Sequence, residues 1–228
     1  MINILYTTYN RLEYTKKTLP VLIQNTKHKD KRFIVVDNHS TDGTQKWLKE
    51  FTKNKKDIWL IENKKNVGVV GAMNQCLGFC DGLMAKVDND TLVPEKWLTT
   101  LLRALHEHSL FAIGAKHKIM HSGYGDWADW MKDLEKIETF DGNLYLTKYV
   151  GGSGVVFRTE GIKEIPARGR FFGWGELQEQ LSQQGRLIAF HEGVYIDLLD
   201  MECDNKYNMD FIDYRLKVGR VKNAKQLL

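Results

Sequence analysis

The sequence is poor in cysteine, because its 228 residues include only Cys76, Cys80 and Cys203. A small, odd number of cysteines in a chain of this length argues against a disulfide framework, so reduced thiols are expected. No apolar run approaches the roughly 18 residues that a membrane-spanning helix needs. The first residues also lack the basic segment and small-residue cleavage site of a signal peptide. We therefore expect a cytoplasmic protein with no membrane-spanning segment.

The sequence also lacks a dominant sign of charge, a repeat of fixed period and any low-complexity tract, with 33 Lys and Arg against 29 Asp and Glu. Hydrophobic residues make up 43% and charged residues 27%, which excludes a disordered chain and fits one large folded domain. The net charge of +4 favours anionic ligands, but it does not by itself indicate nucleic acid.

Short apolar runs alternate with segments of helical spacing over the first half of the chain. We expect strands over residues 2–7, 33–37, 58–61 and 83–87. Helices are expected over residues 12–24, from the 41–44 turn to residue 51, and over 70–80. Pro20 predicts a kink or an early end in the first helix. This alternation predicts an α/β fold with a mostly parallel central sheet and helices on both faces.

Polar residues follow three of these strands, over residues 7–11 (TTYNR), 37–44 (DNHSTDGT) and 88–90 (DND). Ligands of parallel α/β sheets collect at the carboxyl ends of the strands, so these loops are the expected site. Tyr9 could stack on a base, Arg11 could face a phosphate, and Asp37 could accept hydrogen bonds from a base or a ribose. The alternative is that Asp37 and Asp42 are only turn and helix-cap residues.

Asp88 and Asp90 are separated by one residue and come just after an apolar strand. Both carboxylates can turn toward a hard divalent cation such as Mn²⁺ or Mg²⁺, whose other positions are filled by water and diphosphate oxygens. The metal would neutralise the charge that builds on a departing nucleoside diphosphate. An Asp-x-Asp triplet is also common by chance, so its position after the strand carries the prediction.

Four motifs in order, at residues 7–11, 35–44, 66–74 and 88–90, resemble the GT-A glycosyltransferases of family 2. The resemblance covers roughly the first 110 residues well and is weaker up to about residue 195. It implies a single GT-A domain over residues 1–228, with a nucleotide-sugar-binding half over 1–118 and an acceptor-binding half with a C-terminal tail over 119–228.

The resemblance also implies a set of donor-binding residues in the strand-end loops. They are Thr7, Tyr9, Arg11 and Asp37 around the nucleotide, Asp88, Asn89 and Asp90 at the diphosphate and metal, and Asn66, Gly68 and Asn74 on the floor beneath the donor. Two of these residues have a purely structural alternative to donor binding, because Gly68 would permit a tight turn and Asn74 would brace a neighbouring loop.

Further candidates come from the second half of the chain. Residues 151–154 (GGSG) resemble the family segment beneath the donor sugar, where Gly152 would let the backbone approach, although a strand bulge fits as well. Trp174 is the aromatic residue expected at the site. Asp197 lies where relatives place a third metal ligand, usually His, and a hard cation accepts carboxylate as readily. His191 is expected to be structural or to support a metal ligand without binding the metal itself.

The general base is the position at which this sequence departs from the family. Family members usually carry a Glu-Asp pair at the start of a late helix, expected here over residues 176–184, and the aspartate position is occupied by Leu177. Glu176 is the first candidate base, and Glu179, one turn later on the same helical face, is the second. A glutamate at a helix start is also a common dipole partner, so a retaining mechanism stays open.

The resemblance implies a metal-dependent glycosyltransferase that moves a sugar from a nucleotide-diphosphate sugar, expected to be a UDP-sugar, to an acceptor hydroxyl with inversion. Two other classes stay open. A non-catalytic nucleotide- or sugar-binding module would lack a usable base, as Leu177 suggests, and a nucleotidyltransferase also uses paired aspartates on an α/β sheet. The acceptor stays open among a glycan, a lipid-linked sugar, a protein and modified DNA, so nucleic acid enters only as an acceptor.

Overall fold

The computed structural model describes residues 1–117, 131–166 and 173–199 of the chain. In chain order their elements are β1 (Ile2–Thr8), α1 (Leu12–Asn25), β2 (Lys31–Asp37), α2 (Thr44–Thr52), β3 (Ile58–Glu62), α3 (Gly68–Leu77), β4 (Leu83–Asp88), β5 (Thr91–Leu92), α4 (Trp97–Glu107), β6 (Ala112–His117), β7 (Lys136–Ile137), β8 (Leu144–Leu146), β9 (Val155–Arg158), α6 (Trp174–Gln183) and β10 (Ile188–Leu198).

The strands form one mixed sheet in the order β3-β2-β1-β4-β9-β6-β10-β8-β7, with β5 paired to β10. Parallel pairing joins β3, β2, β1 and β4, and it also joins β6 to β10. Between these two groups β9 runs antiparallel to both β4 and β6. The α/β class with a central sheet is confirmed, and the sheet is mixed because the chain returns to its centre through β9.

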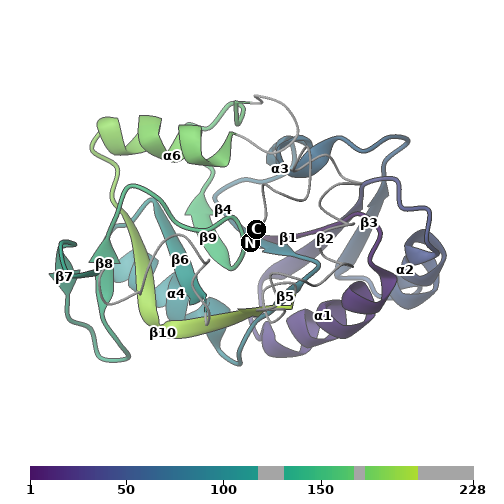
Figure 1. Cartoon of the computed structure of the whole chain (residues 1–228), viewed down its shortest axis with the longest axis horizontal. Coiled ribbons are helices and arrows are strands. Elements are labelled where there is room, and N and C mark those ends of the chain that lie inside the picture. The colour runs from purple at the N-terminus through teal and green to yellow at the C-terminus, as the bar shows by residue number, and fades with distance from the viewer. Residues whose placement is uncertain (118–130, 167–172, 200–228) are drawn as a thin grey trace, which may run out of the picture.

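Helices cover both faces of this sheet, as Figure 1 shows, with α1, α2 and α4 on one face and α3 and α6 on the other. Side chains along a strand alternate between the faces. Tyr6 accordingly packs in the cluster under α1 and α4, whereas its neighbour Leu5 packs in the cluster under α3. The sheet is therefore buried on both sides, and polar residues gather at its strand ends.

The register brings the predicted polar strand ends together. Thr7 of β1 lies opposite Asp88 of β4, and Thr8 lies opposite Asp37 of β2. Three neighbouring parallel strands thus end at one edge of the sheet. This arrangement is the one that the alternating strands and helices predicted.

Four elements differ from the sequence-based expectation. Helix α1 continues past Pro20 to Asn25, so the early end is wrong; its last turn is completed by Thr26, whose Oγ1 donates to the Leu22 carbonyl at 2.6 Å. Helix α3 begins two residues earlier and ends three residues earlier than the range 70–80. Helix α4 and strand β6 were not anticipated, although α4 buries an apolar stripe against the sheet.

None of the described helices is both long enough and apolar enough to cross a bilayer. Cys76, buried in α3, and Cys80, half-buried just after it, are free thiols. Burial raises the pKa of Cys76 to about 12 and that of Cys80 to about 11. Both thiols are therefore protonated at neutral pH, and neither is a candidate nucleophile.

Candidate active site

The loops after β1 and β2 are held together by Asn10. Its backbone N–H donates to Ser40 Oγ at 2.7 Å, and its side-chain Oδ1 accepts from the Thr41 N–H at 2.8 Å. Asn10 and Arg11 both adopt left-handed backbone conformations, with φ of 55° and 64°. Such conformations cost about 1–3 kcal/mol each, and they persist where surrounding contacts impose them. The two loops therefore form one constrained unit at the sheet edge.

Asp42 completes this unit by binding the first N–H groups of two helices. Its Oδ2 accepts from the Leu12 N–H at 2.9 Å, and its Oδ1 accepts from the Thr44 N–H at 3.1 Å and from Thr44 Oγ1 at 2.6 Å. Burial alone would raise the pKa of Asp42, but these hydrogen bonds outweigh burial and hold the pKa below its usual value. The helix-cap alternative describes these contacts of Asp42.

Asp37 is fully buried at the end of β2. Its Oδ2 accepts from the Ser40 N–H at 3.0 Å, and its Oδ1 accepts from the Ser40 hydroxyl. These are the contacts of the turn alternative, and they fix the loop against which Asn10 packs. Tyr9 is half-buried in the loop after β1.

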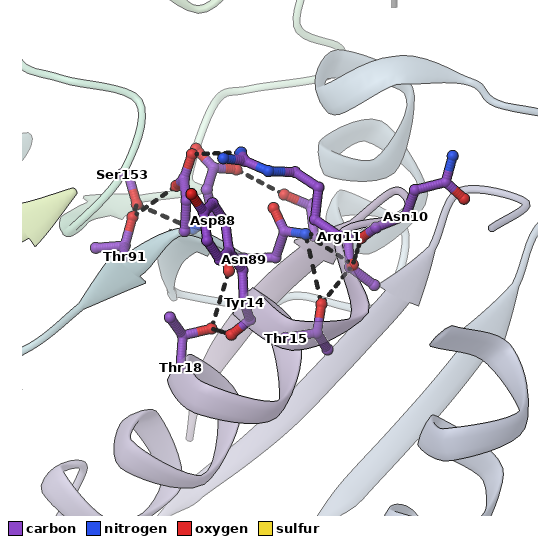
Figure 2. Close-up of polar contacts among 12 residues, drawn as sticks. Asn10, Arg11, Tyr14, Thr15, Thr18, Asp88, Asn89, Thr91 and Ser153 are labelled. Atoms are coloured by element: carbon purple, nitrogen blue, oxygen red, sulfur yellow. Dashed lines mark hydrogen bonds and ion pairs between the residues drawn. The ribbon is translucent and has the colours of Figure 1, made fainter. Parts of the chain in front are cut away.

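Asp88 is held from three directions at the end of β4 (Figure 2). Thr7 Oγ1 donates to its Oδ1 at 2.7 Å, and Lys86 Nζ lies 2.6 Å from its Oδ2. Its backbone N–H donates to Ser153 Oγ at 2.9 Å, and that hydroxyl lies 2.7 Å from Thr91 Oγ1. The carboxylate is thus fixed by Thr7 of β1 and Lys86 of β4, and the Asp88 backbone is fixed by Ser153 from the segment before β9.

Asp90 pairs with Arg11, whose Nη1 lies 3.1 Å from Asp90 Oδ2. The other carboxylate oxygen accepts from Thr91 Oγ1 at 3.2 Å. The Arg11 guanidinium also lies over the Tyr14 ring, 4.2 Å from its centroid. Figure 2 shows Arg11 reaching from the loop after β1 toward the aspartates. Arg11 therefore neutralises a carboxylate of the aspartate turn, and its contact with a phosphate stays a prediction.

Asn89, between the two aspartates, points inward. Its Nδ2 donates to Thr8 Oγ1 at 3.0 Å and to the Asn10 carbonyl at 3.1 Å (Figure 2). The backbone carbonyl of Asn89 accepts from Thr18 Oγ1 at 3.0 Å. These contacts tie the aspartate turn to β1 and α1. Asn89 was predicted to bind the donor, whereas its observed contacts make it a brace for the turn.

The end of β10 lies beside the aspartate turn. Asp197 is the register partner of Leu92 in the β5–β10 pair, and the Leu199 N–H donates to the Asp90 carbonyl at 2.7 Å. Nevertheless, the part of the chain that is described contains no group of three or more His, Cys, Asp or Glu side chains arranged to hold a metal. Asp197 therefore stays a prediction as the third metal ligand beside Asp88 and Asp90.

The donor chemistry of Asp88 and Asp90 nevertheless fits a divalent cation. Both present hard carboxylate oxygens, the ligands that Mg²⁺ and Mn²⁺ accept, two positions apart in one turn. Each carboxylate is also paired with a cation of the chain, Lys86 or Arg11. A metal would therefore share or displace these ion pairs, and water or diphosphate oxygens would complete its coordination.

The predicted floor residues make local contacts. Asn66 Oδ1 accepts from the Gly68 N–H at 2.8 Å, and the Gly68 carbonyl accepts from Asn38 Nδ2 at 3.3 Å. Asn74 bonds the backbone of Ile165 twice, donating to its carbonyl at 3.0 Å and accepting from its N–H at 2.8 Å. These contacts are those of a tight turn at Gly68 and of a brace between α3 and the Ile165 loop at Asn74, the alternatives to donor binding.

Gly152 differs from Gly154, its neighbour in the same segment. A Cβ at Gly154, where φ is +67°, would lie 2.8 Å from Ile196 Cδ1, so packing and backbone both require glycine there. A Cβ at Gly152 would lie at ordinary contact distance, 3.7 Å from Lys86 Nζ and 4.0 Å from Trp174 Cδ1. Neither its backbone conformation nor its described neighbours require a glycine at position 152. Its lack of a side chain leaves space beside Lys86 and Trp174.

Trp174 begins α6 and is 9% exposed. Its Nε1 donates to the Val150 carbonyl at 3.3 Å, and its ring is tilted against Phe157 with centroids 4.8 Å apart. Trp174 was predicted as an aromatic residue at the site. The structure places most of the ring in the core and one edge near Gly152.

Helix α6 carries the two candidate bases, Glu176 in its first turn and Glu179 one turn later. Leu177 is 6% exposed and packs in the core, so the position of the family aspartate offers no carboxylate. Glu176 is half-buried, and Glu179 is exposed. Desolvation and a hydrogen bond with Glu179 raise the pKa of the Tyr149 hydroxyl. Glu179 therefore already has a partner on the segment before β9.

His191 is structural, as predicted. It is fully buried in β10, its Nδ1 accepts from the Gly193 N–H at 3.0 Å, and its Nε2 lies 3.6 Å from Asp141 Oδ1. Burial lowers its pKa, and the nearby Asp141 carboxylate opposes this effect only in part.

The sequence analysis missed Lys86 and Ser153, which hold Asp88, and Ser40, which joins two loops. Lys86 had a readable signal, because a lysine inside an otherwise apolar strand needs a buried counter-charge. The serines had none, since a serine in a loop is the ordinary case.

The comparisons with known proteins agree with this geometry. The model of the family "Glycosyl transferase family 2" matches residues 4–165. An uncharacterized glycosyltransferase of Haemophilus influenzae is 27% identical over 122 residues, which cover 53% of this chain and 38% of that protein.

Several solved structures share the fold at low identity. The mannosyltransferase PcManGT of Pyrobaculum calidifontis, in complex with GDP-Man and Mn²⁺, has a TM-score of 0.69 at 18% identity, covering 86% of this chain and 56% of that one. S. aureus TarS 1–349 with UDP-GlcNAc has a TM-score of 0.64 at 19% identity, covering 86% and 58%. GalNAc-T7 with UDP, GalNAc and Mn²⁺ has a TM-score of 0.70 at 14% identity, covering 87% and 43%.

The chain thus spans less than two thirds of the length of each of these relatives. The family match itself covers most of the chain, from β1 through β9, and includes all four strand-end motifs. The chain therefore belongs to glycosyl transferase family 2 and has the GT-A fold.

Proposed function

We propose that this chain is a metal-dependent glycosyltransferase that moves a sugar from a UDP-sugar to an acceptor hydroxyl with inversion. The observation that carries the proposal is the convergence of Asp88 and Asp90 with Thr7 and Arg11 at the carboxyl edge of three parallel strands. UDP is preferred because two of the three solved relatives above carry UDP or a UDP-sugar. Membership of family 2 removes the nucleotidyltransferase alternative.

Asp88 and Asp90 are the proposed ligands of Mn²⁺ or Mg²⁺. When bound, the metal would neutralise the charge on the departing nucleoside diphosphate. Arg11 pairs with Asp90 and is the proposed second contact of the diphosphate. Gly152 leaves room for the donor sugar, and Tyr9 is the proposed contact of the base.

We divide the chain as the sequence suggested, with donor binding over residues 1–118 and acceptor binding over residues 119–228. The single sheet supports one domain, since strands from both halves pair within it. Cytoplasmic location is also a proposal, supported by the free thiols of Cys76 and Cys80.

The first experiment tests the metal through Asp90→Ala. The change removes one proposed metal ligand, so the gain in UDP affinity that Mn²⁺ gives to the unmodified protein should be lost. Calorimetric titration of UDP with and without Mn²⁺ measures this gain, and exposed Asp81→Ala is the matched control. A metal effect that survives unchanged in Asp90→Ala contradicts the assignment.

The second experiment tests the base. Glu176 is the proposed general base, because Leu177 at the family aspartate position is buried and Glu176 is the half-buried carboxylate beside it in the first turn of α6. Glu176→Gln should lower kcat by about 10²- to 10⁴-fold with UDP affinity nearly unchanged, and Glu179→Gln should do less. Full activity in both variants would mean that neither glutamate is the base, and NMR of the product anomer would then test retention.

The buried Leu177 also favours a second candidate, a non-catalytic module that binds the nucleotide sugar. The two functions differ in release of free UDP from a UDP-sugar on incubation with Mn²⁺. Release above the rate in a Glu176→Gln control supports the enzyme. UDP binding with no release from any sugar of a donor panel supports the module.

A further inference from the structure

Lys86 lies in the middle of β4 with its side chain on the α3 and α6 face of the sheet, because its neighbours Ala85 and Val87 pack on the opposite face. It is 2% exposed and ranks among the largest fully buried side chains. Lysine is almost never buried without a partner, since an isolated ammonium loses its hydration. A buried lysine at this position therefore needs a specific reason.

The partner is the first aspartate of the proposed metal site. Lys86 Nζ lies 2.6 Å from Asp88 Oδ2, and Thr7 Oγ1 donates to the other oxygen of the same carboxylate at 2.7 Å. The ammonium also lies beside the open position at Gly152, 3.7 Å from where a Cβ would be. Lys86 thus holds Asp88 from the floor of the proposed donor site.

The second aspartate is neutralised in the same way by Arg11, at 3.1 Å from Asp90 Oδ2. The four groups Lys86, Arg11, Asp88 and Asp90 therefore sum to no net charge. A free divalent cation that approaches them gains little Coulomb energy, and it must compete with an ammonium in direct contact. A nucleoside diphosphate carries its own negative charge, so the metal is attracted when it arrives with the diphosphate.

We infer that Lys86 is a positioning residue that holds and neutralises Asp88, so that the divalent cation enters this site only together with a nucleoside diphosphate. The inference rests on the proposed function of this edge as a donor site. It makes Lys86 the residue that suppresses binding of the free metal. A purely structural ion pair would stabilise the fold without controlling the metal.

The test is the binding of MnCl₂ in the absence of nucleotide, measured by calorimetry. Lys86→Met keeps the side chain long and removes the charge, so Asp88 becomes an unpaired carboxylate. We expect the affinity for free Mn²⁺ to rise at least about tenfold over the unmodified protein. A structural role alone would not produce this gain. Lys16→Met is the matched control, because it removes an exposed lysine that lies 2.8 Å from Glu13 Oε1.

An unchanged affinity for free Mn²⁺ in folded Lys86→Met overturns the inference. Lys86→Gln provides a second, polar replacement if the methionine variant does not fold. The unmodified protein gives an independent readout: without UDP it should bind Mn²⁺ more weakly than about 1 mM, and with UDP it should bind it saturably. Equal Mn²⁺ affinity with and without UDP also overturns the inference.

This experiment separates the inference from the proposed function. If the free-metal gain appears in Lys86→Met while no sugar is transferred from any donor, the role of Lys86 stands and the transferase proposal fails. If transfer occurs and the free-metal affinity does not change, the transferase proposal stands and the role of Lys86 fails.

Discussion

Side chains at the sheet edge have two kinds of role. Asn89 and Asn74 use their amide groups on neighbouring loops, so they determine the shape of the edge. Asp88 keeps a carboxylate that is 27% exposed, and Gly152 leaves space beside Lys86. The second kind is where a ligand can act, because part of the Asp88 carboxylate and the space at Gly152 are not filled by described side chains.

Gly152→Ala tests this distinction. The new methyl group meets only ordinary contacts, so the melting temperature should stay within about 2 °C, which corresponds to roughly 0.5 kcal/mol for a chain of this size. Because the methyl group fills the proposed space for the donor sugar, the KM for the donor should rise at least about tenfold.

Gly154→Ala is the contrasting variant. Its methyl group would lie 2.8 Å from Ile196 Cδ1 on a backbone with φ of +67°, so it should lose about 1–3 kcal/mol of stability. Thermal melts and donor kinetics of both variants make the comparison. A Gly152→Ala enzyme with unchanged donor KM would contradict the assigned space.

The position of the aspartate pair at the end of a sheet strand could be predicted from sequence, because the Asp-x-Asp triplet directly follows an apolar run. The partners of Asp88 could not. Ser153 reaches it across 65 positions of sequence, and only the antiparallel β4–β9 pairing brings the two together. Trp174 could be predicted only in part. Its neighbours in the sequence suggested a place at the site, whereas most of its ring is buried in the core.

At the scale of elements, the starts of α1 and α2 are coupled. Asp42 accepts from the first N–H of each helix, and Asn10 joins the same two loops through Ser40. The orphan N–H groups of two helices are thus satisfied by one carboxylate. The shape of the donor edge therefore depends on a residue that lies outside the proposed chemistry.

Asp42→Ala should lower the free energy of unfolding by about 1–2 kcal/mol, since it removes the cap of two helices. The pKa of Asp42 is held below its usual value, so its contribution is present above the unfolded pKa and is lost as pH falls through the folded value. The difference between the two proteins should therefore narrow from roughly pH 6 to pH 3. Urea unfolding at both pH values measures it, and a difference that stays constant would contradict a role for the charge.

The elements from β1 to β4 followed from the two-residue and 3.6-residue periods of the sequence. The order of the second half did not. Strand β9 enters the sheet between β4 and β6, and β10 pairs with β6, β8 and β5. Periodicity indicates that a segment is a strand, but it does not indicate which antiparallel neighbour the strand chooses.

At the scale of the whole molecule, β10 connects the aspartate turn with the β7–β8 part of the sheet. One end of this strand lies beside the aspartate turn, and the other part packs against β8 and α4 (Figure 1). His191 sits at that second junction with Asp141 of the β7–β8 turn, which pairs in turn with Arg103 of α4. Protonation of His191 would therefore change the charge at a junction of β10, the β7–β8 turn and α4.

His191→Asn tests that junction through pH. Burial holds the pKa of His191 below its unfolded value, and Asp141 opposes this only in part, so the unfolded state binds more protons between the two values. The stability of the unmodified protein should fall as pH is lowered from roughly 7.5 to 5.5, through the unfolded pKa of about 6.5. Asparagine can still accept from the Gly193 N–H but does not titrate, so the variant should show a shallower pH dependence despite lower stability at pH 7.5. Chemical denaturation across this range measures both slopes. Parallel curves would mean that His191 is not the group that links the fold to pH, because every other titrating residue is common to the two proteins.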